Sequence, residues 1–157
     1  MPPAARTGKG GSSSPAAAGD AVFVNDARSA GLMEVRMGRL AEQQGQAMDV
    51  RAFGQHMVTD HTQLNQQLDT IALKEGLKTP VTSDPKDNEA LADLAKQHGA
   101  AFDHAYIQGQ VADHRAALTL FQQEATHGSD PALKKFAADA LPTLRQHLLM
   151  ANATEGK

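Results

Sequence analysis

The sequence predicts an all-α fold, a single helical bundle, from its composition, its length and its apolar periodicity. The chain of 157 residues contains one Tyr and neither Trp nor Cys. It is rich in Ala, Leu and Gln and poor in β-branched residues, which favours helices over strands. A chain of this length can bury one core of ordinary size without disulfides. Four long segments repeat apolar side chains at alternating steps of three and four, as helices that face a bundle core do.

The N-terminal part of the chain is predicted to lead into the first hairpin of the bundle. Residues 1–19 are mainly Pro, Ala, Gly and Ser, and we expect them to be disordered, either as a native tether or as the remnant of an export signal. The bundle domain is predicted over residues 20–151. Asp20 is expected to cap a helix that ends before Gly45, a stop that tolerates a left-handed conformation. A second helix is predicted from about residue 47 to Gly76.

The second half begins with a loop over residues 77–83. Asp84 and Pro85 then supply a capping carboxylate and a first-turn proline for a short extra helix that ends near residue 98. A third long helix is expected from about residue 100 to the stop at Gly128. Asp130 and Pro131 repeat the same device for the fourth, which reaches about residue 150 and is expected to bend at an internal proline, Pro142. Residues 152–157 are expected to fray.

One ionisable side chain interrupts the apolar stripe of each long helix, and these four are Glu34, His61, His114 and His147. Whether these four side chains lie at one level along the bundle axis depends on how the second and third long helices are connected. A simple meander would separate His114 from His61 by tens of ångströms at about 1.5 Å per residue. If residues 77–99 instead cross over along the bundle, the two helices run parallel and all four side chains converge in the core.

One carboxylate and three imidazoles at one level are predicted to bind a single transition-metal ion. This ligand set suits zinc, which we expect first, with copper or iron as alternatives. Asp60, Asp113 and Gln110 are candidates to hold the imidazoles in the right tautomer. The other histidines fall off the stripes or near helix ends and are assigned no site: His56, His98, His104 and His127. The alternative stays open that the cluster is an inert, hydrogen-bonded polar core that fixes helix register.

Charge and composition exclude several classes of function. The net charge is −3, and no cluster of Lys and Arg is long enough to bind a phosphate backbone, so nucleic acid is not an expected partner. No stretch approaches the roughly 20 apolar residues that span a bilayer. No nucleophile with an adjacent base can be identified, so we predict no enzymatic activity. The sequence leaves a protein partner and the choice between monomer and dimer open.

Several short motifs together resemble a known bacterial family over about residues 20–150. They lie at the start of the first long helix, around the middle histidine of the second, and along the third and fourth. The matching positions are Phe23, Val24, Asp26, Gly31, Leu32, Glu34, Val35, Met57, Val58, Asp60, His61, Thr62, Ala101, Phe102, Asp103, Tyr106, Gln110, Val111, His114, Leu141, Pro142, Leu144, Arg145, His147 and Leu148. The chain resembles the domain-of-unknown-function family four-one-four-two.

The resemblance implies a ferritin-like four-helix bundle and a periplasmic or cell-envelope location, since members of this family are described as exported or outer-membrane proteins. Ferritin-like enzymes with two iron ions carry a Glu three residues before each of two ligand histidines. This chain has Val58, Val111 and Leu144 at those positions. We therefore expect no di-iron centre.

Overall fold

The computed structural model describes residues 15–157, and the described part of the chain forms five helices without strands. These are α1 (Pro15–Gln44), α2 (Met48–Lys74), α3 (Pro85–Ala95), α4 (Gly99–His127) and α5 (Pro131–Glu155). The predicted all-α bundle with a short extra helix is confirmed. Most of the segment predicted to be disordered lies outside the described residues. Residues 152–155, which were predicted to fray, are helical, because α5 continues to Glu155.

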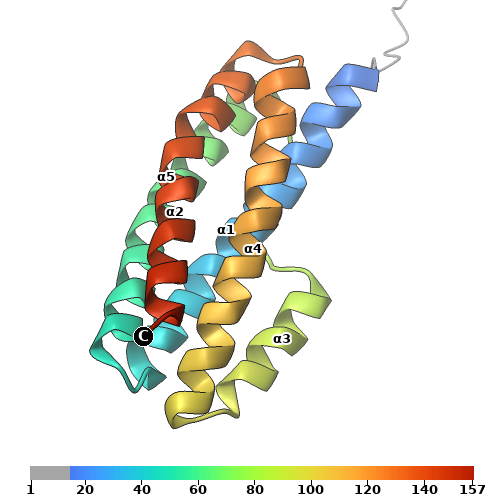
Figure 1. Ribbon diagram of the computed structural model, residues 1–157. Coiled ribbons are helices and arrows are strands. Elements are labelled where there is room, and N and C mark those ends of the chain that lie inside the picture. The colour runs from blue at the N-terminus through green and yellow to red at the C-terminus, as the bar shows by residue number, and fades with distance from the viewer. Residues whose placement is uncertain (1–14) are drawn as a thin grey trace, which may run out of the picture.

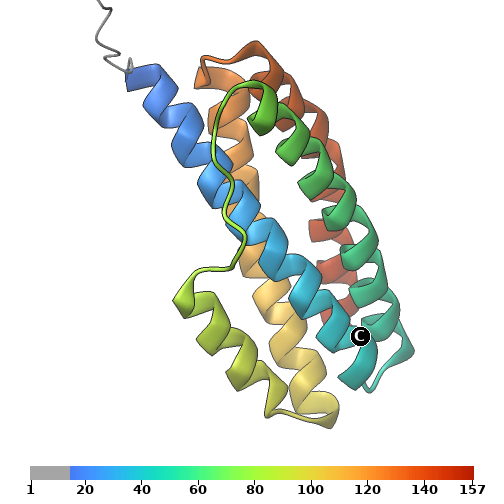
Figure 2. The ribbon, with the colours of Figure 1, turned by 180° about the vertical axis from the view of Figure 1, so that it is seen from behind.

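Two antiparallel hairpins, α1–α2 and α4–α5, lie side by side (Figures 1 and 2). The loop that follows α2, together with α3, leads the chain from one end of the bundle to the other (Figure 2). Helices α2 and α4 therefore run parallel, as the predicted crossover requires. The crossover segment descends along the outer side of α1, and α3 then packs beside α1 and α4 (Figure 2). No helix within residues 15–157 is long and apolar enough to cross a membrane.

Local sequence signals explain most helix ends. The side chains of Asp84 and Asp130 accept hydrogen bonds from Lys86 N at 2.8 Å and Leu133 N at 2.9 Å, and each is followed by the first-turn proline. After α2, Gly76 adopts a φ of 67°, and Leu77 N donates to Ala72 O at 2.8 Å. This is the Schellman arrangement that a glycine permits at a helix C-terminus.

Two predictions about the first hairpin are wrong. Asp20 does not cap α1, because the alanines before it continue the helix back to Pro15, and its carboxylate instead accepts from Ser129 N and Asp130 N. α1 ends before Gly45 as predicted, but Gly45 does not adopt a left-handed conformation. It is needed for space, since a Cβ atom there would lie 2.6 Å from the carbonyl oxygen of Ala41.

Each hairpin turn is held by a carboxylate from the other hairpin. Asp20 of α1 binds the α4–α5 turn as described, and Asp103 of α4 accepts from Gln46 N and Ala47 N, both at 2.8 Å, at the α1–α2 turn. An ionised acceptor makes these backbone hydrogen bonds stronger than neutral ones. The two reciprocal contacts fix the axial offset between the hairpins, and with it the level at which their core residues meet.

The core consists of two apolar clusters stacked along the bundle axis. The Phe23 cluster comprises Phe23, Val24, Ala27, Leu68, Ala72, Phe121, Leu133, Phe136, Ala137, Ala140, Leu141 and Leu144. The Phe53 cluster comprises Ala41, Val50, Phe53, Met57, Leu94, Phe102, Tyr106, Ile107, Val111 and Ala151. On each of the four long helices, one of the predicted site residues lies between members of the two clusters.

Candidate metal centre

A polar layer separates the two apolar clusters. It contains Glu34, His61, Gln110, His114 and His147, with exposed fractions of 7%, 6%, 1%, 1% and 0%. All four residues predicted for the site are therefore buried at the predicted level of the bundle. Buried polar groups normally find hydrogen-bond partners, so the contacts within this layer determine what it can do.

The structure brings the three predicted histidines together. Each can offer one ring nitrogen, and these three atoms lie within 4.8 Å of one another. The ring centroids of His61, His114 and His147 are 5.2 to 5.7 Å apart in pairs. The side chains come from α2, α4 and α5 respectively, so tertiary packing, and not a local motif, creates the group.

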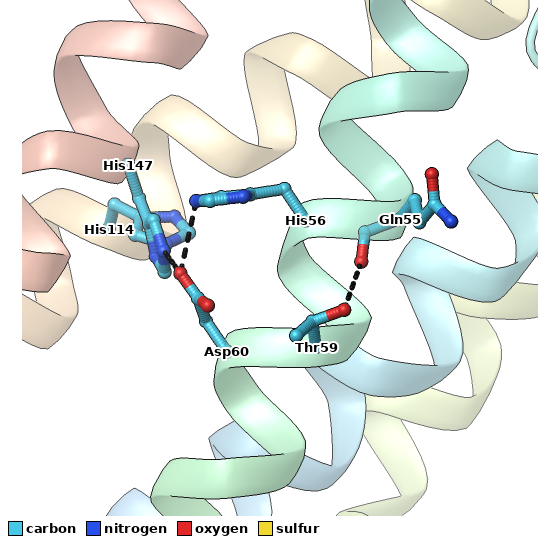
Figure 3. Close-up of polar contacts among 6 residues, drawn as sticks. All are labelled: Gln55, His56, Thr59, Asp60, His114 and His147. Atoms are coloured by element: carbon cyan, nitrogen blue, oxygen red, sulfur yellow. Dashed lines mark hydrogen bonds and ion pairs between the residues drawn. The ribbon is translucent and has the colours of Figure 1, made fainter.

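A chain of close polar contacts runs through two of these imidazoles. His114 Nδ1 lies 2.9 Å from Gln110 O, His114 Nε2 lies 3.2 Å from His147 Nδ1, and His147 Nε2 lies 2.8 Å from an Asp60 carboxylate oxygen. The same oxygen lies 3.0 Å from His56 Nε2. In Figure 3, Asp60 lies between His56 and His147, with His114 beside His147 on the far side.

The ends of this chain fix the protons of the two rings. The Gln110 carbonyl and the ionised Asp60 carboxylate can only accept, so His114 Nδ1 and His147 Nε2 must both carry hydrogens. A neutral imidazole has a single N–H. His114 Nε2 and His147 Nδ1 are then both bare lone pairs that face each other, and the contact between them lacks the proton that a hydrogen bond needs.

Adding that proton is unfavourable because of burial. Burial lowers the pKa of His114 to about 4 and lowers the pKa of His147, although the hydrogen bond to Asp60 opposes the effect at His147. Burial and the neighbouring imidazoles also hold the pKa of His61 well below its usual range. The rings are therefore neutral near pH 7, the form in which imidazole binds metal ions.

His61 adds a third unpaired nitrogen. Its Nε2 atom is buried and has no hydrogen-bond partner within the described structure. An unpaired buried polar group costs about 1–3 kcal/mol and calls for an explanation. Three neutral imidazoles with free nitrogens in one buried group can coordinate a cation.

Glu34 lies in the polar layer but outside this group. None of the clusters of candidate ligand atoms within 4.8 Å among the described residues includes its carboxylate. Burial, with a further contribution from the charge on Asp113, raises the pKa of Glu34 to about 8, and its Oε2 atom has no hydrogen-bond partner. Its ligand role stays a prediction that this geometry does not favour.

His56 was not predicted to belong to the site, and Asp60 was predicted only as a candidate to orient an imidazole ring. His56, Asp60 and His147 form a second group of potential ligand atoms at the edge of the layer. Side chains of His56 and Asp60 are 43% and 25% exposed, so His56 shows no apolar-stripe signal. The two residues are four positions apart on one helix, a spacing that brings their side chains together, and this was the sequence signal that could have identified the pair.

Comparison with known proteins identifies a family and a fold. A family described as "Domain of unknown function (DUF4142)" matches residues 5–154. The crystal structure of a DUF305 fragment from Deinococcus radiodurans superposes with a TM-score of 0.78 and 12% identity, over 91% of this chain and 99% of that one. At this identity the likeness concerns the fold alone. No curated protein matches the sequence.

Proposed function

This chain belongs to the DUF4142 family, a domain of unknown function, so its role has to be argued from the site, and we propose that it binds one transition-metal ion in the bundle core. The ligands are His61, His114 and His147. The proposed role is non-catalytic binding or buffering of the metal, and the proposed location is the cell envelope, which rests on the family resemblance alone.

The observation that carries the proposal is the contact between His114 Nε2 and His147 Nδ1. Two lone pairs at 3.2 Å repel each other unless something positive lies between them. Two nitrogen ligands of a tetrahedral zinc ion, each about 2.0–2.1 Å from the metal, are about 3.3 Å apart. The observed separation therefore suits a shared cation, and the unpaired His61 Nε2 supplies a third donor.

The surroundings support the same assignment. Metal-binding histidines usually donate their second N–H to a carbonyl or a carboxylate, which fixes the tautomer and the ring orientation. Gln110 O does this for His114, and Asp60 does it for His147. Asp60, one of the three residues predicted to orient the imidazoles, is thus a positioning residue.

Three imidazoles with one open position favour zinc, and copper or ferrous iron remain alternatives. We assign Glu34 no place among the ligands of the bound metal, because its carboxylate belongs to none of the groups of ligand atoms among the described residues. The bridging carboxylates of a di-iron centre are not proposed, because residues Val58, Val111 and Leu144 occupy the positions that would have to supply them.

One observation favours the alternative of an inert polar core. The contacts from Gln110 through His114, His147 and Asp60 to His56 link α4, α5 and α2 and could serve only to fix helix register. In that case the protein would hold no metal, and a proton would occupy the contact between His114 and His147.

Metal content and metal-dependent stability separate the two functions. The protein is purified without a metal-chelating column, analysed for metal, stripped with chelator and titrated with Zn²⁺. We expect binding of one equivalent and, at free zinc 100-fold above the dissociation constant, an increase of about 2.7 kcal/mol in the free energy of unfolding. No binding together with a chelator-insensitive melt would reject the proposal.

Three variants and one control test the residues. His61→Gln and His114→Gln should abolish one-to-one binding, whereas the exposed His104→Gln should bind as the wild type does. Asp60→Asn should bind about 10- to 100-fold more weakly, as loss of an orienting carboxylate does in other sites. Melts in chelator identify variants that fail to fold, and unchanged affinity in all folded variants would contradict the assignment.

A further inference from the structure

A cavity of about 430 Å³ leads from the surface to two of the three histidines. His61, His114 and Glu34 line its inner part, and Asp84 and Asp87 line it from the α3 side. Its other lining residues come mainly from α1, α2 and α4, and Lys86 joins Asp84 and Asp87 at the start of α3. The polar layer is therefore accessible from one side of the bundle.

Two buried polar atoms without partners belong to residues that line this cavity. They are His61 Nε2 and Glu34 Oε2, on side chains that are 6% and 7% exposed. One belongs to a proposed ligand, and the other lies at the same level on α1. A cation in the cavity would satisfy both atoms, whereas an apolar ligand would leave both unpaired.

The lining carries an excess of negative charge. Four aspartates and one lysine line it, namely Asp26, Asp84, Asp87, Asp113 and Lys86, whereas Glu34 is mostly protonated near pH 7 because burial raises its pKa to about 8. Asp84 is engaged as the cap of α3. Asp87 and Asp113 face the cavity from different helices, and each adds to a field that concentrates cations in a low-dielectric cleft.

We propose that this cavity is the route by which a divalent cation reaches the three histidines, with Asp87 and Asp113 attracting it at the mouth and Glu34 contacting it on the way in. The inference rests on the metal-binding function proposed above. It gives Glu34 a role that its distance from the ligand group otherwise leaves unexplained.

The opposite side of the layer is the rival route. A smaller hollow of about 280 Å³ is lined by Asp60 and Asp139, but none of the three histidines lines it. The Asp60 oxygen there already accepts from both His56 and His147. A cation entering from this side would have to displace these contacts, whereas the acidic cavity opens directly onto His61 and His114.

Binding kinetics of Co²⁺, followed by its visible absorption in a stopped-flow instrument, test the electrostatic part. The Asp87→Asn/Asp113→Asn double variant should bind Co²⁺ about tenfold more slowly than wild type at low ionic strength, with the difference shrinking in high salt. Asp139→Asn removes one carboxylate at the rival hollow and should leave the rate unchanged. Equal rates in the double variant and wild type would overturn the route.

A steric variant tests the path itself. Ala116 is an exposed residue of α4 that lines the cavity, and Thr119 is an exposed residue of the same helix that does not. Ala116→Phe should slow binding and release of Co²⁺ by the same factor, about fivefold or more, and leave the dissociation constant unchanged. Thr119→Phe should change neither rate. A change in the dissociation constant of Ala116→Phe without a parallel slowing of binding and release would contradict the proposal.

The two proposals fail in distinguishable ways. If wild-type protein takes up no Co²⁺ or Zn²⁺ at equilibrium, the metal-binding function is wrong and the route with it. If wild type binds one equivalent but the rates are insensitive to the cavity variants, or Asp139→Asn slows binding, only the route is wrong.

Discussion

Burial of single titratable groups in the polar layer has consequences that can be measured. Glu34 is a carboxyl group without a cation beside it, and its pKa is raised from 4.5 to about 8, first by burial and then by the charge on Asp113. Since the folded state holds the proton more tightly than the unfolded chain does, the free energy of unfolding falls as pH rises between these two values.

Glu34→Gln should remove most of this pH dependence. In chelator, the variant should gain about 3.5 kcal/mol over wild type between pH 5 and pH 8, because it carries no charge to bury and each pKa unit corresponds to about 1.4 kcal/mol. Urea melts across this range measure the difference. The exposed Glu42→Gln is the control, and parallel pH profiles for wild type and Glu34→Gln would show that the carboxyl group ionises freely.

Sequence could predict the histidines of the layer but not the state of its protons. His61, His114 and His147 each interrupt an apolar stripe, a signal that periodicity reveals. Which ring nitrogen faces Gln110 O and which faces Asp60 depends on side-chain rotamers and packing between helices. The same limit applies to Glu34, which is buried in the layer but belongs to none of the groups of ligand atoms within 4.8 Å among the described residues.

At the scale of helices, two glycines allow α1 and α2 of the first hairpin to pack closely against each other. A Cβ atom at Gly54 of α2 would lie 2.6 Å from Gly38 O of α1, and one at Gly38 would lie 2.7 Å from Gly54 O. The obstacle in each case is backbone, which cannot rotate away. Gly109 of α4 is also inside a helix, but nothing lies within 4 Å of a Cβ built there.

Gly54→Ala and Gly109→Ala should therefore have opposite effects. The first should lower the free energy of unfolding by about 2 kcal/mol, because overpacking at the helix contact outweighs the better helix propensity of alanine. The second should raise it by about 0.5–1 kcal/mol, since only the propensity changes. Denaturant melts measure both, and stabilisation by Gly54→Ala would mean that α1 and α2 separate without cost.

Helix starts marked by an aspartate followed by proline were predictable, whereas others were not. Asp84 and Asp130 cap α3 and α5 because side-chain capping is a local interaction. Asp20, which is followed by Ala21 and not by proline, was also expected to cap a helix but is bound to a turn more than 100 residues away. A carboxylate can accept hydrogen bonds from the backbone N–H groups of its own helix start or from those of a distant turn, and only the tertiary arrangement decides which.

For the molecule as a whole, the crossover determines whether a site exists. Because the chain returns along the bundle before α4 begins, α2 and α4 run parallel and His61 meets His114. Length and composition predicted the bundle, and the need to align four polar positions selected this topology over a meander. The cavity beneath α3 was not predictable, since it depends on how loosely a short helix packs.

The crossover and α3 form the least buried part of the described structure, and this predicts where the molecule opens first. Leu94 is the buried residue of α3. Arg36 of α1 ties the segment down, donating from Nη1 to Asn88 Oδ1 and, at 3.3 Å, to Ser83 Oγ. Regions with few buried apolar contacts open with low free energies, independently of global unfolding.

Arg36→Ala should release this segment while the four long helices stay folded. Hydrogen exchange followed by mass spectrometry should show exchange about tenfold faster in residues 77–98, equivalent to about 1.4 kcal/mol of local stability, with little change in α2 and α5. Arg39→Ala, an exposed change on the same helix, should leave the pattern as in wild type. If exchange instead rises equally throughout Arg36→Ala, the crossover unfolds only with the bundle, and α3 is an integral part of the core instead of a cover over the cavity.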